Sequence, residues 1–123
     1  MRIRHKLWLE DDSGLLFGQG RFNLLQTIDE LGSLSAAAKA MKMSYRAAWG
    51  RIRASEERMG LSLLQKAPTG RGLVLTPAGK KLLDLFGRFE EQIEAACQKK
   101  GQELFGRDLS QDLSSKLKPN EPD

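Results

Sequence analysis

The chain has 123 residues, of which 40% are hydrophobic and 29% are charged, and its formal net charge is +4. These values exclude a generally disordered chain and fit one globular domain with an appendage. No apolar run approaches the roughly 20 residues that cross a bilayer, and the N-terminus reaches acidic residues before any signal-type apolar stretch. We therefore expect a cytoplasmic protein without a membrane segment.

The first predicted elements are a β hairpin and a helix. Strands are expected over 3–10 and 15–18, because the turn-forming residues 11–14 separate two short runs that favour extended structure. Leucine and isoleucine then recur at helical spacing, which predicts a helix over 21–31 that Gly32 ends.

Two more helices are predicted in close succession. Ser35 is expected to cap a short alanine-rich helix that runs to Met41. Ser44 is expected to cap a longer helix over 44–58, which Gly60 ends. The spacing leaves only a tight turn between these two helices.

A second hairpin and a long helix complete the pattern. Strands are predicted over 61–67 and 73–76, on either side of the basic tip "PTGRG". Thr76 is a suitable N-cap and Pro77 suits the first helical position, so a helix should begin there and run to about Lys100.

The helix over 76–100 carries an apolar stripe at alternating steps of four and three residues, a spacing typical of one helix that packs along another. The stripe consists of Leu82, Phe86, Phe89, Ile93 and Ala96. A helix of about 36 Å is also longer than so small a domain can cover, so we predict dimerisation along it. The alternative is that the stripe covers only the domain's own core. The remaining residues, 101–123, are predicted to be a partly disordered tail, with Phe105, Leu109, Leu113 and Leu117 spaced as on an amphipathic helix.

This order of elements predicts a fold that is mainly α with small β hairpins, a winged helix-turn-helix with a long C-terminal dimerisation helix. We divide it into an N-terminal β hairpin (1–19), a winged helix-turn-helix (20–75), a dimerisation helix (76–100) and the tail (101–123). In such a fold the second helix of the helix-turn-helix enters the major groove of double-stranded DNA.

Basic residues are concentrated where this fold would meet DNA. Between residues 39 and 81 there are ten basic and two acidic side chains, a local net charge of +8. A run of charge can be no more than a solvated face, but here it coincides with the predicted helix-turn-helix and wing. The coincidence favours binding to a phosphate backbone.

Individual DNA contacts can be assigned from position. Base readout is expected from Tyr45, Arg46 and Trp49, with Arg46 foremost because arginine can bind guanine through two hydrogen bonds. Phosphate contacts are expected from helix N-termini and basic side chains. They are Ser35, Lys42, Ser44, Arg51 and Arg53 and, on the wing over 66–72, Lys66, Thr69 and Arg71.

Each assignment has an alternative. Tyr45 and Trp49 are equally suited to be core aromatics. Arg53 and Arg58 have acidic neighbours with which they would form surface ion pairs of small energetic worth, namely Glu56, Glu57 and Asp29.

Catalytic and metal-binding patterns are lacking in the sequence. It contains no G-x-S-x-G, H-E-x-x-H, Walker or dinucleotide motif, so we predict that the chain is not an enzyme. One cysteine, Cys97, and one histidine, His5, are too few soft ligands for a zinc site, and we expect no structural metal. His5 is expected to be an exposed strand residue, and the glutamates at 90, 91 and 94 to form the outer face of their helix.

Two stretches, "GSLSAAAKAMKMSYRAAWGRI" and "GLSLLQKAPTGRGLVLTPAGKKLL", resemble the N-terminal DNA-binding domain of ModE-type molybdate-responsive transcriptional regulators. The resemblance covers most of 20–94, and "SYRAAW" (44–49) is its most specific part. LysR-type regulators are similar in "GSLSAAAKAM" and "LTPAGKKLL". The resemblance implies a homodimeric transcriptional regulator that binds a palindromic operator, with the helix over 76–100 paired across the two-fold axis.

The sequence also departs from that family. Full-length ModE-type regulators carry C-terminal molybdate-binding domains, whereas this chain ends at Asp123, so we expect no cofactor in the chain and no molybdate sensing. Its wing, "APTGRG", also looks shorter than the family's glycine-rich wing. Two competing hypotheses stay open: a winged-helix module that binds a partner protein through the apolar stripe and the tail, and a domain that binds a metal or an oxyanion.

Overall fold

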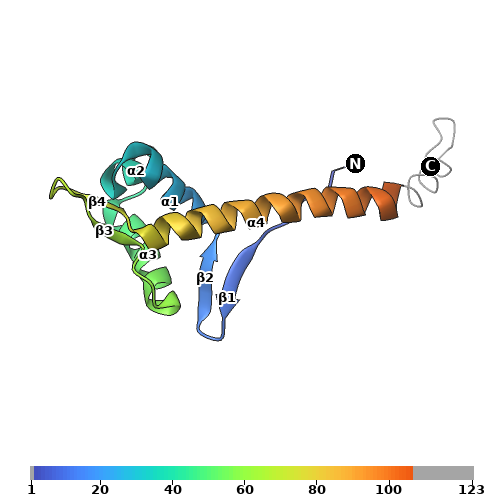
Figure 1. The fold of residues 1–123 in the computed structure, drawn as a ribbon, viewed down its shortest axis with the longest axis horizontal. Helices are drawn as coiled ribbons and strands as arrows, with labels where there is room; N and C mark the ends of the chain where they lie inside the picture. Colours follow the sequence, from blue (N-terminus) through green and yellow to red (C-terminus); the bar gives the residue numbers. More distant parts are fainter. Residues whose placement is uncertain (1, 107–123) are drawn as a thin grey trace, which may run out of the picture. The chain divides into compact units, whose positions relative to one another are not determined.

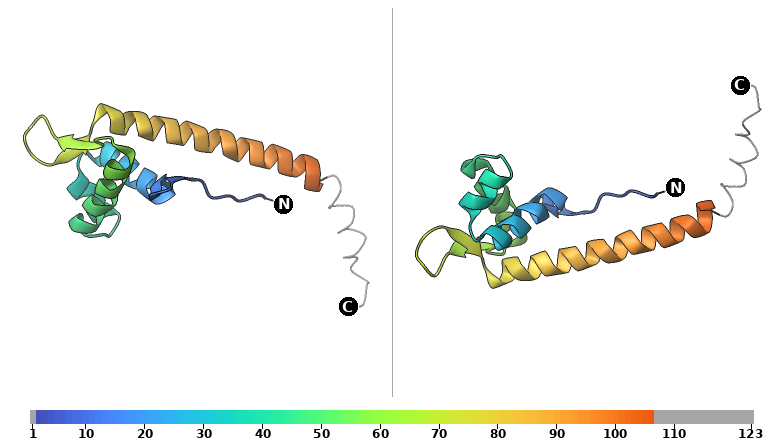
Figure 2. Two further views of the ribbon diagram at one scale, coloured as in Figure 1. Left: turned by 90° about the horizontal axis from the view of Figure 1, so that it is seen from below. Right: turned by 90° about the horizontal axis from the view of Figure 1, so that it is seen from above.

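The computed structural model describes residues 2–106, which divide into two compact units. The larger unit is Lys6–Arg88, and the smaller unit combines the N-terminal residues up to His5 with the chain from Phe89 onward. Helix α4 (Pro77–Gly101) is continuous and contributes residues to both units, and Figure 2 follows it along its whole length.

The larger unit combines three complete helices, the start of α4 and two antiparallel strand pairs (Figure 1). Its helices are α1 (Gln19–Leu31), α2 (Leu34–Ala40) and α3 (Tyr45–Met59). Strand β1 (Trp8–Asp11) pairs with β2 (Gly14–Gly18), and β3 (Leu64–Lys66) pairs with β4 (Leu73–Leu75). The arrangement is a mainly helical winged helix-turn-helix followed by a long helix, which confirms the predicted fold class.

The hydrophobic core lies within the larger unit. It gathers buried side chains from helices α1 to α4, from β2 and β4 and from the residue before β3: Phe17, Leu24, Leu25, Ile28, Leu34, Ala37, Ala38, Ala48, Ile52, Leu63, Leu75 and Phe86. The ring of Phe86, from α4, meets Phe17 edge-on at a centroid distance of 5.1 Å and Phe22 at 5.3 Å. These contacts fix the first turns of α4 against the helix-turn-helix.

The sequence predicted the N-cap of α3 correctly and the N-cap of α2 incorrectly. The Ser33 hydroxyl accepts a hydrogen bond from the backbone N–H of Ala36 at 3.1 Å, so Ser33 caps α2. The prediction of Ser35 as the cap was wrong, because Leu34 is buried in the core and begins the helix ahead of the alanine run. The Ser44 hydroxyl caps α3 as predicted, by accepting from the N–H of Ala47 at 3.0 Å.

The turn between α2 and α3 is short, as predicted. Lys42 adopts the left-handed conformation, with φ of 57°, and the N–H of Met43 donates to the carbonyl of Ala38. This geometry reverses the chain within four residues and places α3 directly after α2.

The start of α4 is also as predicted. The Thr76 hydroxyl accepts from the N–H of Gly79 at 2.9 Å and donates to the carbonyl of Ser62, so one side chain caps α4 and holds the chain before β3. The wing strands are shorter than the predicted 61–67 and 73–76.

The N-terminal residues do not form the predicted strand over 3–10, since β1 begins only at Trp8. The Ile3 backbone instead makes two hydrogen bonds with the Gln98 side chain, which donates to its carbonyl and accepts from its N–H. The expectation that His5 is an exposed strand residue was therefore wrong: its side chain is only 15% exposed and lies outside any strand. A helix side chain supplies the hydrogen bonds that a partner strand would have made.

The described residues of the smaller unit end with a π-helical turn, η1 (Gln102–Gly106), where the sequence predicted the start of a tail. The predicted amphipathic positions Leu109, Leu113 and Leu117 lie outside the described residues. Between residues 2 and 106, no helix combines the length and the hydropathy required to cross a bilayer.

Candidate nucleic-acid interface

Helix α3 has one face in the core and one face on the surface. Ala48 and Ile52 are buried among the other helices, and the Ser55 hydroxyl donates to the carbonyl of Leu16 in β2. These contacts fix the rotation of α3 about its axis and so decide which of its side chains reach solvent.

The first turns of α3 present the three residues that we expect to read bases. Tyr45 is 48% exposed, Trp49 is 42% exposed and Arg46 is exposed between them. The alternative in which Tyr45 and Trp49 are buried core aromatics is therefore wrong. Their contact with bases stays a prediction.

The predicted phosphate contacts around the helix-turn-helix are also on the surface. Ser35, Lys42 and Ser44 are exposed in the first turn of α2, in the turn and at the N-cap of α3. The Ser44 hydroxyl is occupied as the cap, so a phosphate there would bind to free backbone N–H groups of the first turn of α3.

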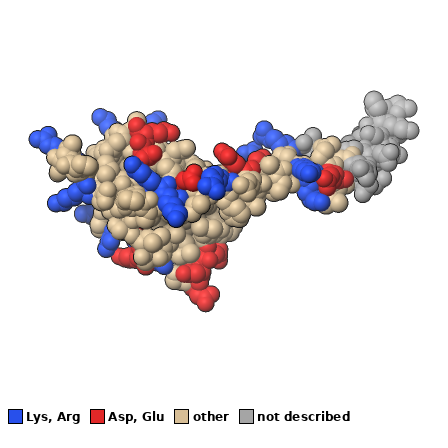
Figure 3. Space-filling view, in the orientation of Figure 1, with Lys and Arg blue, Asp and Glu red and all other residues tan. Residues whose placement is uncertain are grey.

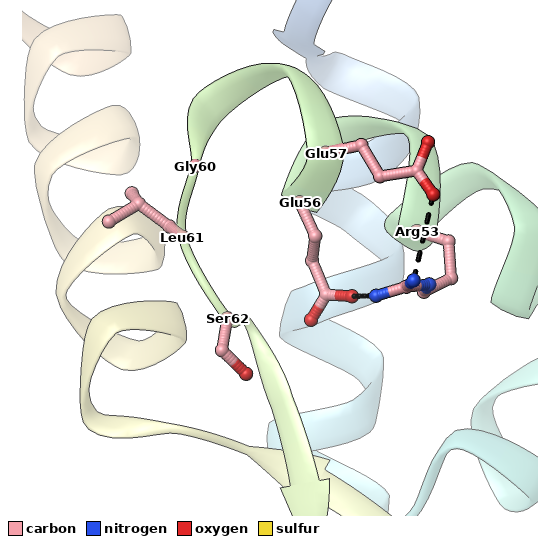
Figure 4. Close-up of a pocket in the computed structure, with 6 residues that line it drawn as sticks. All are labelled: Arg53, Glu56, Glu57, Gly60, Leu61 and Ser62. Carbon is pink, nitrogen blue, oxygen red and sulfur yellow. Dashed lines mark hydrogen bonds and ion pairs between the residues drawn. The ribbon is translucent and has the colours of Figure 1, made fainter.

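Arg53 is held by neighbours on its own helix, as Figure 4 shows. Its guanidinium lies 3.3 Å from a carboxylate oxygen of Glu56 and 3.6 Å from one of Glu57, and its Cζ is 5.6 Å from the centroid of the Trp49 ring. The alternative of a surface ion pair is thus correct for Arg53. A DNA phosphate would compete with two carboxylates for this side chain, so Arg53 is less suited to phosphate binding than its sequence position suggested. Its contact with a phosphate stays a prediction.

Glu56 positions the wing rather than binding a ligand. Its carboxylate is 9% exposed and accepts hydrogen bonds from the backbone N–H groups of Leu63 at 2.7 Å and Leu64 at 3.1 Å. The shallow hollow of about 260 Å³ beside it, drawn in Figure 4, is lined by Glu57 and Glu56 as well as Arg53. Two carboxylates make this hollow unsuitable for a phosphate.

A second group of arginines forms where the sequence pattern did not predict one. Arg21 on α1 and Arg58 on α3 both donate to the carbonyl of Leu15, at 3.4 and 2.7 Å. Burial lowers the pKa of the Arg21 guanidinium, and the positive charges of Arg58 and Arg51 lower it further. Like charges held this close favour an added anion such as a phosphate. No local pattern in the sequence relates Arg21 to the arginines of α3.

The wing residues are exposed at the tip of the second hairpin. Lys66 ends β3, and Thr69 and Arg71 lie in the loop beside two glycines with positive φ, Gly70 at 82° and Gly72 at 78°. Figure 3 shows basic side chains projecting from the end of the larger unit that carries this hairpin. The wing therefore carries positive charge at its tip, as predicted.

The predicted dimer stripe on α4 divides into two parts. Leu82 packs against the core and Phe86 is 3% exposed, so in the larger unit the stripe covers the core, as in the alternative. Phe89, at 46%, and Ala96 are exposed in the smaller unit, and Ile93 is half-buried. The part that is free to meet another helix begins at Phe89.

Residues 20–80 match the family described as bacterial regulatory helix-turn-helix protein, lysR family. Residues 20–80 therefore form a LysR-type helix-turn-helix domain. The match spans α1, α2, α3 and the wing, which carry all the residues assigned to DNA contact. Because this is a family of regulatory DNA-binding domains and not of enzymes, it agrees with the prediction that the chain is not an enzyme.

The chain is also similar to molybdenum-related proteins, ModE among them, which confirms the resemblance to ModE. It is 40% identical over 81 residues to the molybdenum-pterin-binding protein MopB of Rhodobacter capsulatus, covering 63% of the chain and 30% of MopB. It is 31% identical over 93 residues to the transcriptional regulator ModE of Haemophilus influenzae, covering 73% of the chain and 36% of that ModE. The chain thus spans about a third of the length of these relatives.

Solved structures of LysR-type regulators share the fold. The chain superposes on VV2_1132, a LysR family transcriptional regulator, with a TM-score of 0.51 and 26% identity over 65% of this chain and 29% of that one. It superposes on full-length CbnR, solved in complex with its target DNA, with a TM-score of 0.54 and 25% identity over 68% of this chain and 28% of that one.

Proposed function

We propose that the chain is a sequence-specific DNA-binding transcriptional regulator that acts as a homodimer on a palindromic operator. The observation that supports this most is the exposed first turn of α3, where Tyr45, Arg46 and Trp49 project from a LysR-type helix-turn-helix. Such a regulator acts on DNA in the cytoplasm.

In this proposal base readout and phosphate binding are separate tasks. Arg46 binds a guanine edge in the major groove, flanked by Tyr45 and Trp49. Lys66 and Arg71 of the wing bind phosphates on one side. Arg51, with Arg21 and Arg58 beside it, binds phosphates on the other flank of α3. Burial lowers the pKa of Arg21 most, and the positive charges of Arg58 and Arg51 lower it further.

Dimerisation follows from the exposed part of the α4 stripe. Phe89, Ile93 and Ala96 lie at steps of four and three along the helix, with Phe89 and Ala96 exposed and Ile93 half-buried. Pairing of two α4 helices would bury this stripe and present two α3 helices to successive major grooves, about 34 to 36 Å apart.

The experiment that tests the function is selection of bound sequences from random duplex DNA at two salt concentrations. A two-fold symmetric site whose binding weakens steeply with salt supports the proposal. The Arg46→Ala variant should lose discrimination at one base position of each half-site, by about 1–3 kcal/mol. Arg88→Ala serves as the matched control, since Arg88 is exposed on α4 and paired with Asp84.

Two outcomes would overturn parts of the proposal. Unchanged sequence preference in Arg46→Ala would remove Arg46 from base readout. No enriched sequence at either salt concentration would favour the alternative, a winged-helix module that uses the α4 stripe to bind a partner protein.

The oligomeric state is tested separately by analytical ultracentrifugation of Ile93→Asp. A charge in the stripe should convert the dimer to a monomer and weaken binding to the palindrome while leaving half-site preference intact. We also propose that DNA binding by this chain is indifferent to molybdate, which adding molybdate to the selection would check.

A further inference from the structure

The smaller unit contains a cluster of metal-ligating side chains that plays no part in the proposed DNA contacts. The imidazole of His5, the only histidine of the chain, lies between two carboxylates of α4. Its Nε2 is 2.9 Å from an oxygen of Glu90, and its Nδ1 is 3.0 Å from an oxygen of Glu94. Since Glu90 and Glu94 are four residues apart, they lie on the same side of the helix.

The ring nitrogens of the imidazole lack good hydrogen bonds. Both ring nitrogens of His5 are closed off from solvent, and within residues 2–106 neither has a well-aligned hydrogen-bond partner despite the short distances to the carboxylates. Buried polar atoms normally have such partners. A cation bound to one ring nitrogen and to both carboxylates would give these three side chains a common partner.

Neighbouring contacts hold the cluster in place. The Gln98 side chain donates to Glu94 at 3.1 Å and also makes two hydrogen bonds with the Ile3 backbone. Through its one amide group, Gln98 thus positions both the Glu94 carboxylate and the segment that carries His5. Supporting hydrogen bonds of this kind orient metal ligands in protein sites.

We propose that His5, Glu90 and Glu94 bind a divalent transition-metal ion with the coordination chemistry of Zn²⁺. One imidazole and two carboxylates form a donor set that Zn²⁺ accepts, and two negative charges balance the charge of the ion. Three protein ligands leave a fourth position for water.

The distances allow this coordination after a small side-chain movement. One donor atom from each residue can be chosen so that all three lie within 4.8 Å of one another. Bonds of about 2.0–2.2 Å in a tetrahedral site place the donor atoms closer together than that. Glu94, whose side chain is 49% exposed, is free to make this adjustment.

Metal binding at this cluster depends on pH. The metal requires a neutral imidazole and ionised carboxylates, so its affinity falls as the pH is lowered. Binding would also tie residues 2–5 to α4, which stabilises the smaller unit.

The test is calorimetric titration of Zn²⁺ into the full chain after removal of any histidine tag, with Mg²⁺ as the hard-ion control. We expect one Zn²⁺ per chain and no comparable binding of Mg²⁺. The variants His5→Ala and Glu94→Gln should each weaken Zn²⁺ binding at least about tenfold. Glu91→Gln, an exposed change on the same helix, is the matched control and should bind as the parent chain does.

Two further measurements distinguish this site from Zn²⁺ binding elsewhere on the chain. Cys97→Ser should keep Zn²⁺ binding, since Cys97 is not among the three ligands. Nitrogen NMR of the imidazole yields a single histidine signal, because the chain has one histidine, and that signal should shift on addition of Zn²⁺. Absence of Zn²⁺ binding by the parent chain, equal binding by His5→Ala, or an unshifted imidazole signal would overturn the proposal. None of these readouts depends on DNA binding.

Discussion

The two units of the chain are stabilised by different kinds of contact. All the residues of the buried apolar core belong to Lys6–Arg88. Among the described residues of the smaller unit only Gly101 is buried, while Phe89, Leu104 and Phe105 are about half-exposed. The larger unit is therefore stable through its own core, and the smaller unit depends on polar contacts and on what covers its apolar side chains.

The same difference appears in two polar side chains, Glu56 and His5. Glu56 in the larger unit accepts from two backbone N–H groups and pairs with Arg53, so its charge is fully compensated. His5 in the smaller unit faces two carboxylates without aligned hydrogen bonds. A satisfied polar group stabilises a fixed structure, whereas the unsatisfied one leaves a place for a metal ion.

The largest expected effect comes from removing core volume. Ile52→Ala should lower the free energy of unfolding by about 2–5 kcal/mol, because it leaves a cavity among α1, α2 and α3. Leu104→Ala in the smaller unit should change it by less than about 0.5 kcal/mol, since that side chain is 54% exposed. Urea unfolding of both variants measures the contrast. Equal losses would show that the smaller unit carries a share of the core.

Replacing one glycine in each unit with alanine compares the two units again, with an intermediate effect expected on stability. A Cβ on Gly79 would lie 2.5 Å from the backbone carbonyl oxygen of Leu63, which the backbone N–H of Thr76 holds in place through a hydrogen bond of 2.9 Å. We expect Gly79→Ala to cost about 1–3 kcal/mol in unfolding free energy.

The counterpart in the smaller unit is Gly101. A Cβ there would lie 2.6 Å from the Ile3 side chain, which can rotate away, and alanine favours the helix. Gly101→Ala should therefore change the melting temperature much less than Gly79→Ala. A loss as large as that of Gly79→Ala would mean that the Ile3 segment is packed as rigidly as the core.

Sequence patterns predicted the larger unit well because its signals are local. Helical spacing, the Ser44 cap and the Thr76–Pro77 start all lie within a few residues of the elements that they define. The exposed face of α3 followed from the same spacing, since burial of Ala48 and Ile52 leaves Arg46 outside.

The errors arose where partners are distant in the sequence. The N-terminal residues alternate as a strand would, but Gln98 supplies the hydrogen bonds to Ile3. The neighbours of His5 and the approach of Arg21 to Arg58 were hidden for the same reason. No spacing rule relates such residues before the chain has folded.

The smallest expected loss of stability comes from removing one hydrogen-bonding side chain in each unit. Ser33→Ala should cost about 1 kcal/mol, because it removes the side-chain acceptor for the N–H of Ala36 at the start of α2. Ser35→Ala is the matched control: Ser35 is exposed inside the helix, where alanine is favoured, so the change should be neutral or slightly stabilising.

In the smaller unit, Gln98→Ala removes hydrogen bonds near the surface and should cost less than Ser33→Ala in thermal unfolding, since water can replace them. Its main effect should be local: amide hydrogen exchange of residues 2–5 should accelerate while that of α3 stays unchanged. Faster exchange in α3 as well would contradict the inference that the core of the larger unit is stable without the contacts of residues 2–5 with α4. Unchanged exchange in residues 2–5 would mean that contacts other than Gln98, such as those of His5 with Glu90 and Glu94, are enough to hold the segment on α4.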